Sequence, residues 1–486
     1  MRLAAAGLAL SLALGTAAGP AGAADPGPVI TKHYDDGSIY EGTFRAGVPE
    51  GKGHYRMPNG YEYEGDWVAG EIRGQGTARF ANGSVYSGAF AGGKPEGKGR
   101  MVFPDGAIYE GDWREGEMTG EGTLRHADGS VYSGSFHDGR PEGRGTLQMA
   151  NGSLYEGDWA GGEKSGEGRL AYPDGSRYEG RFAGGQREGR GRFITPDGLV
   201  YEGDWAGGQI EGQGKLTQPN GDVYEGGFTA GRREGEGRVI FANGDRYEGG
   251  FRADRREGRG TFRQADGYVY EGEWREGRRS GAGTARYPDG SVYEGAFAED
   301  RPEGQGKLTY ADGSVYEGEW RAGAIGARGR LSRPGGLVYE GEFAAGKPEG
   351  EGRMTYPDGQ THEGAWRAGQ PEGRGTARYA DGSVYEGDFV AGRREGQGRL
   401  TRPDGLGYEG GWTAGEMSGQ GRATYPDGSS YEGGFLGGKP EGEGVLRTAD
   451  GIESRGIWRA GQLDRTAATP AAATAEQAPV QGTAGE

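Results

Sequence analysis

A long series of glutamates offers the most obvious chemistry in this sequence. Each follows a tyrosine directly, and their spacing is 23 residues or a multiple of it, as in Glu41, Glu64, Glu110 and Glu156. Such a row could attract divalent cations, or its members could act in pairs as general acids and bases. The alternative is an ion pair between each glutamate and a lysine or arginine of the next strand, such as Lys98, Arg100 or Lys215. No calcium-loop spacing is present, which favours the ion pairs.

The residues that most often catalyse reactions are scarce or poorly placed. The chain has no cysteine, which excludes disulfides, thiolate metal sites and cysteine nucleophiles. Serine and aspartate recur at turn positions, but no histidine is placed to complete a hydrolase triad with them. The sequence therefore predicts no catalytic residue, no cofactor-binding residue and no metal site, hence a protein that is not an enzyme. Each histidine occupies an ordinary repeat position, and none has a second histidine four residues away: His33, His54, His126, His137 and His362.

Arginines at one loop position form the densest local cluster of charge. Nearby, Asp254 and Asp300 replace loop glycines. Stacked repeats would place these loops about 10 Å apart along one edge. Such a basic ridge could bind anionic lipid headgroups or an acidic protein segment through guanidinium contacts; alternatively it is a solvated face offset by Glu234 and Glu257. The candidate ridge consists of Arg232, Arg233, Arg255, Arg256, Arg278, Arg279 and Arg301.

A repeat of constant length places all of these residues. Nineteen units begin at positions 40 to 454 in steps of 23 residues, with no insertion or deletion. Tyrosine begins every unit except those at His362 and Ser454. Glycine follows two residues later and phenylalanine or tryptophan four residues later in all units. Such strict self-similarity indicates a stacked array of small structural units.

The spacing inside each unit indicates β-strands. In 109–113, tyrosine, glycine and tryptophan alternate with two acidic residues, so the apolar residues share one face of a strand. A second segment, such as 97–103, alternates in the same way, and Asn-Gly or Asp-Gly between units suggests a two-residue hairpin turn. Each unit is thus expected to be two antiparallel strands. The repeat-defining aromatic face includes Tyr63, Trp67, Tyr109, Trp113, Tyr155, Trp159, Tyr201, Trp205, Tyr270, Trp274, Tyr316 and Trp320.

Composition agrees with a stacked array rather than with ordinary globular domains. The chain has 486 residues, of which 109 are glycine, while 10% are aromatic. Aromatic rings packed over glycines of neighbouring strands would replace the missing aliphatic core. The expected fold is all-β: an elongated, single-layer antiparallel sheet, a solenoid-like ribbon of stacked 23-residue hairpins. A net charge of −17 disfavours nucleic acid as a partner.

The two ends of the chain differ from the array. Residues 1–24 combine Arg2, an apolar stretch and small residues, which is typical of a cleaved signal peptide, so we expect an exported, periplasmic or secreted protein. The array is expected over 29–463, with a lone strand within 29–37 before the first unit, and 464–486 is expected to be a disordered Ala/Thr/Pro-rich tail. An open edge strand at either end would allow a homodimer.

The repeat resembles a known family. Tyr-Glu-Gly-Asp-Trp, then Gly-x-Gly, then Asp-Gly, in 23-residue units over about 34–463, resembles the MORN (membrane occupation and recognition nexus) repeat. That resemblance implies elongated antiparallel β-sheets that act in membrane association, protein interaction or dimerisation. Two functions follow as hypotheses: an exported scaffold for protein partners whose identity the sequence does not give, binding through an aromatic groove or a loop edge, or a peripheral module that docks on an anionic membrane surface through the arginines.

Overall fold

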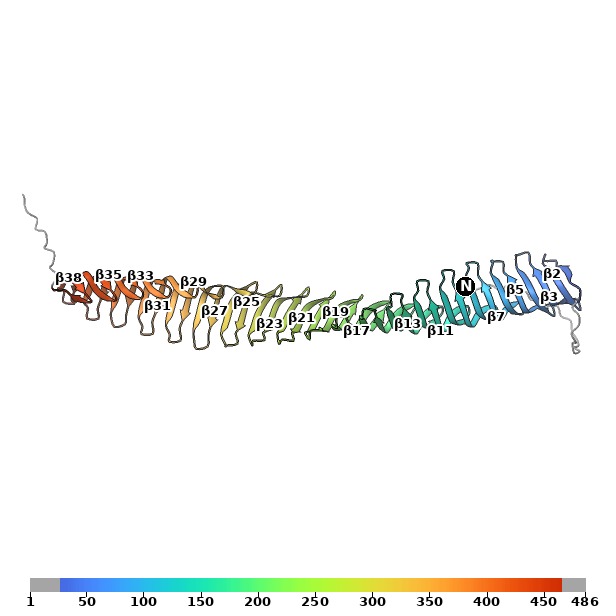
Figure 1. Ribbon diagram of the computed structural model, residues 1–486, viewed down its shortest axis with the longest axis horizontal. Coiled ribbons are helices and arrows are strands. Elements are labelled where there is room, and N and C mark those ends of the chain that lie inside the picture. The colour runs from blue at the N-terminus through green and yellow to red at the C-terminus, as the bar shows by residue number, and fades with distance from the viewer. Residues whose placement is uncertain (1–26, 466–486) are drawn as a thin grey trace, which may run out of the picture. The chain divides into compact units, whose positions relative to one another are not determined.

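The computed structural model describes residues 27–465, and all regular structure in that range is β-strand. The described residues form two compact units, which meet in the sequence between Arg255 and Arg256. The predicted signal peptide at 1–24 and nearly all of the predicted tail at 464–486 lie outside the described residues. The expected all-β architecture of stacked hairpins is confirmed in each unit (Figure 1).

In the first unit, each strand pairs antiparallel with the next strand of the sequence. Strands of seven residues, which begin a repeat, alternate with strands of nine residues, which complete it. The strands are β1 Ile30–His33, β2 Ile39–Arg45, β3 Val48–Arg56, β4 Glu62–Val68, β5 Glu71–Arg79, β6 Val85–Ala91, β7 Lys94–Val102, β8 Ile108–Arg114, β9 Glu117–Arg125, β10 Val131–His137, β11 Arg140–Gln148, β12 Leu154–Ala160, β13 Glu163–Ala171, β14 Arg177–Ala183, β15 Gln186–Ile194, β16 Val200–Ala206, β17 Gln209–Thr217, β18 Val223–Thr229, β19 Arg232–Ile240 and β20 Arg246–Arg252.

The second unit repeats the same alternation and the same sequential antiparallel pairing. Its last strand is only two residues long. The strands are β21 Arg255–Arg263, β22 Val269–Arg275, β23 Arg278–Arg286, β24 Val292–Ala298, β25 Arg301–Thr309, β26 Val315–Arg321, β27 Ala324–Ser332, β28 Val338–Ala344, β29 Lys347–Thr355, β30 Thr361–Arg367, β31 Gln370–Arg378, β32 Val384–Val390, β33 Arg393–Thr401, β34 Gly407–Thr413, β35 Glu416–Thr424, β36 Ser430–Leu436, β37 Lys439–Arg447, β38 Glu453–Arg459 and β39 Gln462–Leu463.

The predicted place of the tight turn was wrong. The two-residue turn lies inside the repeat, for example at Gly92-Gly93, where both residues have positive φ (55° and 78°) as a type I′ turn requires. Asn-Gly and Asp-Gly lie instead in a five-residue loop between repeats. There only the glycine has positive φ, and the Asn82 side chain accepts a hydrogen bond from the Ser84 N–H at 2.9 Å. Asn-Gly therefore marks a longer loop closed by a side chain.

The core of each unit is a ladder of tyrosines held over glycines, as the sequence predicts. Tyr86 pairs with Met101, and its ring covers Gly88 and Gly99, where an added Cβ would overlap ring atoms. The same ring meets Phe90 edge-on at 5.0 Å and Trp113 of the next repeat at 5.2 Å. Burial raises the pKa of Tyr86 to about 12. Each ring therefore links its own repeat to the next one.

The tyrosine hydroxyl explains why phenylalanine does not serve in its place. Register shifts between Gly88 and Phe90, and the bulge leaves the Ala89 carbonyl outside the ladder. The Tyr86 hydroxyl donates to this carbonyl at 2.9 Å. Tyr201 and Tyr408 bond the corresponding carbonyls at 2.9 Å in their repeats. Each hydroxyl thereby satisfies a buried acceptor that the bulge creates.

His362 is the exception to this arrangement within the second unit. Its ring lies edge-on between Trp366 and Phe389 at 5.0 and 4.6 Å, but its buried Nε2 has no hydrogen-bond partner. Burial lowers the pKa of His362 to about 4 from an ordinary value of 6.5. The unfolded chain therefore binds a proton that the folded repeat excludes between these two pH values.

His362→Tyr is expected to stabilise its repeat by roughly 1–3 kcal/mol, because the new hydroxyl can bond the Ala365 carbonyl and the unpaired nitrogen disappears. The advantage should grow as the pH falls from about 6.5 to about 4, since only the histidine protein loses stability by this route. Urea unfolding of both proteins across that range measures the difference. A constant difference at every pH would contradict the assignment of a buried neutral imidazole.

Candidate interaction surfaces

The face of the sheet opposite the tyrosines, here called the polar face, carries ladders of opposite charge. Arg100 Nε lies 3.0 Å from Glu110 Oε1, and Lys98 Nζ lies 2.7 Å from Asp112 Oδ1. Farther along the first unit, the Arg192–Glu202 and Lys215–Glu225 pairs measure 3.0 and 3.5 Å. The predicted cross-strand pairing of the post-tyrosine glutamates is thus confirmed at these positions. These side chains are exposed, so each pair contributes little stability, and the regular pattern of charge is their main consequence.

Two open hollows lie on the polar face of the first unit. One of about 670 Å³ crosses β6 to β10, and the other, of about 590 Å³, crosses β15 to β18. Pairs of glycines such as Gly203 and Gly214 form their floors, and charged residues such as Arg192 and Glu202 form their walls. Both hollows run across several strands and stay open to solvent. This form suits an extended chain better than an enclosed small molecule.

The aromatic face predicted from the sequence lies on one side of the sheet, but its rings are not available to a partner. Tyr63, Tyr109 and Tyr201 have no solvent exposure. The other members of the predicted set are also buried, with at most 7% of any side chain exposed; they are Trp67, Trp113, Tyr155, Trp159, Trp205, Tyr270, Trp274, Tyr316 and Trp320. An open aromatic groove of the kind that the sequence suggested is therefore absent at these positions.

The second arginine of each predicted pair packs on aromatic rings. Arg256 lies 4.0 Å from the Trp274 ring, and its Nη2 donates to the Gly277 carbonyl at 3.0 Å. Arg233 lies over Phe251 at 5.4 Å, and Arg279 contacts Phe297 at 6.0 Å. Proline, isoleucine or methionine occupies this position in other repeats, such as Pro95 and Met118. These guanidinium groups therefore cover the core where each repeat meets the following one.

The aspartates that replace loop glycines hold two of these arginines. Asp254 Oδ1 accepts hydrogen bonds from the Arg233 backbone N–H at 3.0 Å and from its Nε at 3.3 Å. Asp300 holds Arg279 through the same two contacts, at 2.9 and 3.3 Å. Both aspartates have positive φ, 71° and 69°. The side-chain contacts offset the strain that glycine would avoid.

The first arginines of the pairs point to the opposite side, since successive residues of a strand alternate between faces. Arg232 lies exposed in the first unit, where Arg255 is also exposed at the start of β21. In the second unit Arg278 and Arg301 are exposed, and Arg278 forms an ion pair with Glu299. The seven predicted arginines thus divide between the two faces.

A second set of glutamates, which sequence analysis did not single out, joins neighbouring repeats. Glu96 accepts a hydrogen bond from the Glu115 N–H at 2.9 Å, and Glu188 accepts from the Gly207 N–H at 3.0 Å. In each case the donor lies in the tight turn of the following repeat, 19 residues later. The turns are also linked through the backbone, as where the Gly93 N–H donates to the Ile72 carbonyl at 3.1 Å. The recurrent Pro-Glu-Gly or Arg-Glu-Gly was the available sequence signal.

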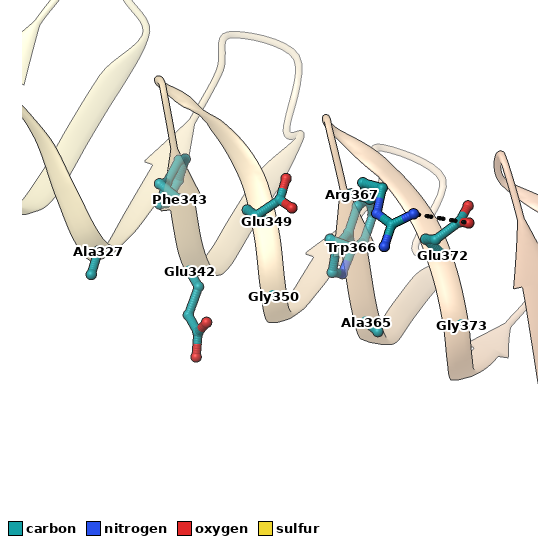
Figure 2. Close-up of a pocket in the computed structure, with 10 residues that line it drawn as sticks. All are labelled: Ala327, Glu342, Phe343, Glu349, Gly350, Ala365, Trp366, Arg367, Glu372 and Gly373. Atoms are coloured by element: carbon teal, nitrogen blue, oxygen red, sulfur yellow. Dashed lines mark ion pairs between the residues drawn. The ribbon is translucent and has the colours of Figure 1, made fainter.

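The second unit has a hollow of about 430 Å³ beside the least regular strand (Figure 2). At Ala327, β27 departs from the glycine of other repeats, and its pairing with β28 begins only at Arg328. Glu349 and Glu372 of this hollow accept backbone hydrogen bonds at 2.8 and 3.0 Å, while the Glu342 side chain is directed away from them (Figure 2). Two of its three carboxylates accept hydrogen bonds from turns and the third is directed away, so this hollow offers little to a ligand.

Residues 27–465 contain neither a metal-binding cluster nor a membrane-spanning helix. No group of three or more histidine, cysteine or acidic side chains is placed to hold a metal ion there. The same part of the chain contains no helix of the length and apolarity needed to span a bilayer.

Comparison with known proteins identifies the repeat and little else. Alsin of Rattus norvegicus is 41% identical over 54 residues, which are 10% of this chain and only 3% of alsin. The TCP10 domain of Danio rerio CPAP is 15% identical, with a TM-score of 0.26, over 46% of this chain and 99% of that one. The Drosophila melanogaster SAS-4 TCP domain, solved in complex with a proline-rich motif of Ana2, is 13% identical, with a TM-score of 0.22, over 38% of this chain and 98% of that one. The MORN repeat model matches residues 40–60, 63–85, 86–108, 109–131, 132–154, 155–177, 178–200, 201–223, 224–246, 247–267, 270–292, 293–315, 316–338, 339–361, 362–384, 385–407, 408–430 and 431–452.

Proposed function

Because the chain belongs to the MORN repeat family, we propose that it is an exported, non-enzymatic scaffold that binds extended segments of partner proteins on its polar face. The observation that carries the proposal is the difference between the two faces of the sheet. The aromatic rings are buried in the core and cannot contact a partner. The polar face, in contrast, has open hollows with glycine floors and charged walls. Export rests on the signal-like sequence at 1–24.

The hollow over β15 to β18 suits a polypeptide of mixed charge. Its walls alternate in sign along the unit, as in Arg192, Glu202, Lys215 and Glu225, whose pairs are 3.0 and 3.5 Å apart. A partner with charges in the complementary order can exchange these exposed pairs for intermolecular ones at small cost. Specificity would then come from the order of charges along the unit.

The alternative, docking on an anionic membrane through the arginines, is less well supported. Arg233, Arg256 and Arg279 are engaged on rings and turn carbonyls or carboxylates, so they are poorly placed to reach lipid headgroups. The net charge of −17 also opposes general attraction to an anionic bilayer. Exposed Arg232, Arg278 and Arg301 are the residues through which such docking would act.

A photocrosslinking amino acid at Gln213 tests the proposal in cells that make the protein. Gln213 is exposed and lines the hollow, whereas Gln209 is exposed in the same strand beside the tight turn, and so serves as the matched control. We expect a discrete protein adduct from position 213 and none from 209. Adducts from 209 alone would place binding at the turn edge instead.

Vesicle sedimentation of the purified full chain tests the membrane alternative. With phosphatidylglycerol or phosphatidylcholine vesicles, we expect no sedimentation above background at low or moderate salt. Salt-sensitive binding to phosphatidylglycerol alone, lost when Arg232, Arg278 and Arg301 are changed to glutamate, would establish membrane docking in place of the proposed function.

A further inference from the structure

We propose that copies of this chain associate head to tail, with β38 of one copy pairing with β1 of the next, so that the two strands together form a repeat of which residues 27–465 of each copy contain only parts. The inference goes beyond the proposed function and does not depend on it. It rests on the open edges of these two strands and on two exceptions to the repeat pattern that complement each other.

β1 is the second strand of a repeat whose first strand is missing from the described chain. In complete repeats, such a strand lies between two others, as β7 lies between β6 and β8. β1 pairs with β2 in the corresponding register, with Lys32 opposite Tyr40 and Ile30 opposite Gly42. No strand within 27–465 pairs with its other edge, and all four of its residues are exposed. Such an edge is a template for a further strand.

β38 is the complementary half. It begins the last repeat and pairs fully with β37, from Glu453 opposite Arg447 to Trp458 opposite Gly442. On its outer side, Trp458 and Arg459 pair with the two residues of β39, and the Ile457 carbonyl accepts a hydrogen bond from the Asp464 N–H at 2.8 Å. Residues 453–456 have no strand partner on that side in the described part of the chain. Within the described residues, the last repeat thus lacks the strand segment that β1 resembles.

The register of a complete repeat predicts which residues would face each other. In β6 and β7, Tyr86 faces Met101 and Gly88 faces Gly99. By the same 23-residue spacing, Ser454 of one copy would face Lys32 of the next, and Gly456 would face Ile30. Four consecutive residues of each strand would pair, from 453 opposite 33 to 456 opposite 30.

The two exceptions to the repeat meet at this junction. In complete repeats a tyrosine ring covers two facing glycines, and a side chain at Gly99 would overlap the Tyr86 ring. Every nine-residue strand keeps that glycine, whereas β1 has Ile30; the repeat of β38 has Ser454 in place of the tyrosine. In the isolated chain, Leu463 fills part of the space that the missing ring leaves, with its Cδ1 2.8 Å from where a Cβ of Gly456 would lie. The isoleucine side chain would pack against Leu463 in the rest of that space.

The surroundings of that space are apolar. Trp458, Leu446 and Leu463 belong to the last hydrophobic cluster of the second unit or pack against it, and Leu463 Cδ1 approaches Gly456 on its aromatic side. Ile30 is 48% exposed in the isolated chain. Burying this side chain against the cluster would extend the aromatic ladder from one copy into the next.

Because the two joined edges differ, a pair of copies still presents one β1 edge and one β38 edge that a further copy can join. Such a heterologous contact adds copies one after another, into a ring or an open series, instead of joining two copies about a twofold axis. A paired segment of four residues gives a small interface, so the association should be weak and depend on concentration. This arrangement differs from the closed homodimer that the sequence suggested.

Sedimentation velocity of the full chain over a hundredfold range of concentration tests the proposal. We expect the average mass to rise beyond that of a dimer as concentration increases. Ile30→Lys should weaken this association about tenfold or more, because a charge would replace the buried isoleucine. Val390→Lys is the matched control: Val390 is 49% exposed but lies far along the sequence from either end strand, and its change should have no effect.

A pair of compensating substitutions makes the test specific. Ser454→Tyr alone should weaken the association, because the new ring and the Ile30 side chain need the same space. Ile30→Gly alone should also weaken it, because no side chain would then fill that space. The protein with both changes rebuilds the tyrosine-over-glycine arrangement and should associate at least as well as the unmodified chain. The proposal would be overturned if the unmodified chain stayed monomeric or stopped at a dimer. It would also be overturned if the double variant associated as weakly as the weaker of the two single variants.

Discussion

Tyr109→Ala is expected to destabilise its part of the first unit by about 3–5 kcal/mol, the usual cost of deleting a buried aromatic side chain. The Tyr109 ring has no solvent exposure and meets Trp113 at 5.3 Å and Phe136 at 4.9 Å. Its loss removes contacts to both its own repeat and the next. Hydrogen exchange should show lost protection in β8 to β10 first, because stacked repeats unfold locally.

Tyr109→Phe is the matched control for that experiment. It keeps the ring and removes only the hydroxyl, which donates to the Asp112 carbonyl at 3.0 Å. The expected cost is about 0.5–1.5 kcal/mol, the net value of one hydrogen bond. Equal effects of the two substitutions would show that the bond to the bulge, rather than ring packing, holds neighbouring repeats together.

Gly421→Ala is expected to destabilise the second unit by about 1–3 kcal/mol through overpacking. A Cβ at Gly421 would lie 2.5 Å from the Tyr408 hydroxyl oxygen and 2.7 Å from Cζ of its ring. The ring is locked between Trp412 at 5.3 Å and Phe435 at 4.9 Å, so it has little room to move away. Urea unfolding followed by tryptophan fluorescence measures the loss.

Gly407→Ala makes the same chemical change in the adjacent strand with the opposite expectation. The nearest atom to an added Cβ at Gly407 is 3.9 Å away, and most other repeats carry a side chain there. The substitution should therefore be neutral or stabilise by up to about 1 kcal/mol, because alanine restricts the unfolded chain. If neither substitution lowered the free energy of unfolding, the space over glycines such as Gly421 would not be needed by the tyrosine rings.

The sequence is sufficient to predict the strands, their shared aromatic face and the ion pairs, because all three follow from alternation with period two. Tyr109, Gly111 and Trp113 must lie on one face once the segment is a strand. The 23-residue spacing then sets Arg100 opposite Glu110, and the 3.0 Å contact follows.

The features that the sequence did not predict depend on contacts between repeats. The position of the tight turn depends on φ at residues such as Glu115, which adopts 52° although its side chain disfavours that region. The capping of that turn by Glu96 crosses 19 residues. Adjacent arginines look equivalent in the sequence, yet Arg256 packs on the Trp274 ring of the next repeat whereas Arg255 is exposed. The hollows of the polar face are each lined by residues of four or five strands, so no pattern within one repeat predicts them.

The claim that the polar face of the first unit binds a polypeptide can be tested by reversing one ion pair. Arg192→Glu together with Glu202→Arg keeps the 3.0 Å cross-strand pair but inverts the order of charge in the hollow. We expect the protein adduct from position 213 to disappear while the unfolding curve is unchanged. The same reversal at Arg330 and Glu340, a 2.8 Å pair of the second unit, should leave the adduct intact. An undiminished adduct in the Arg192 and Glu202 variant would contradict the account.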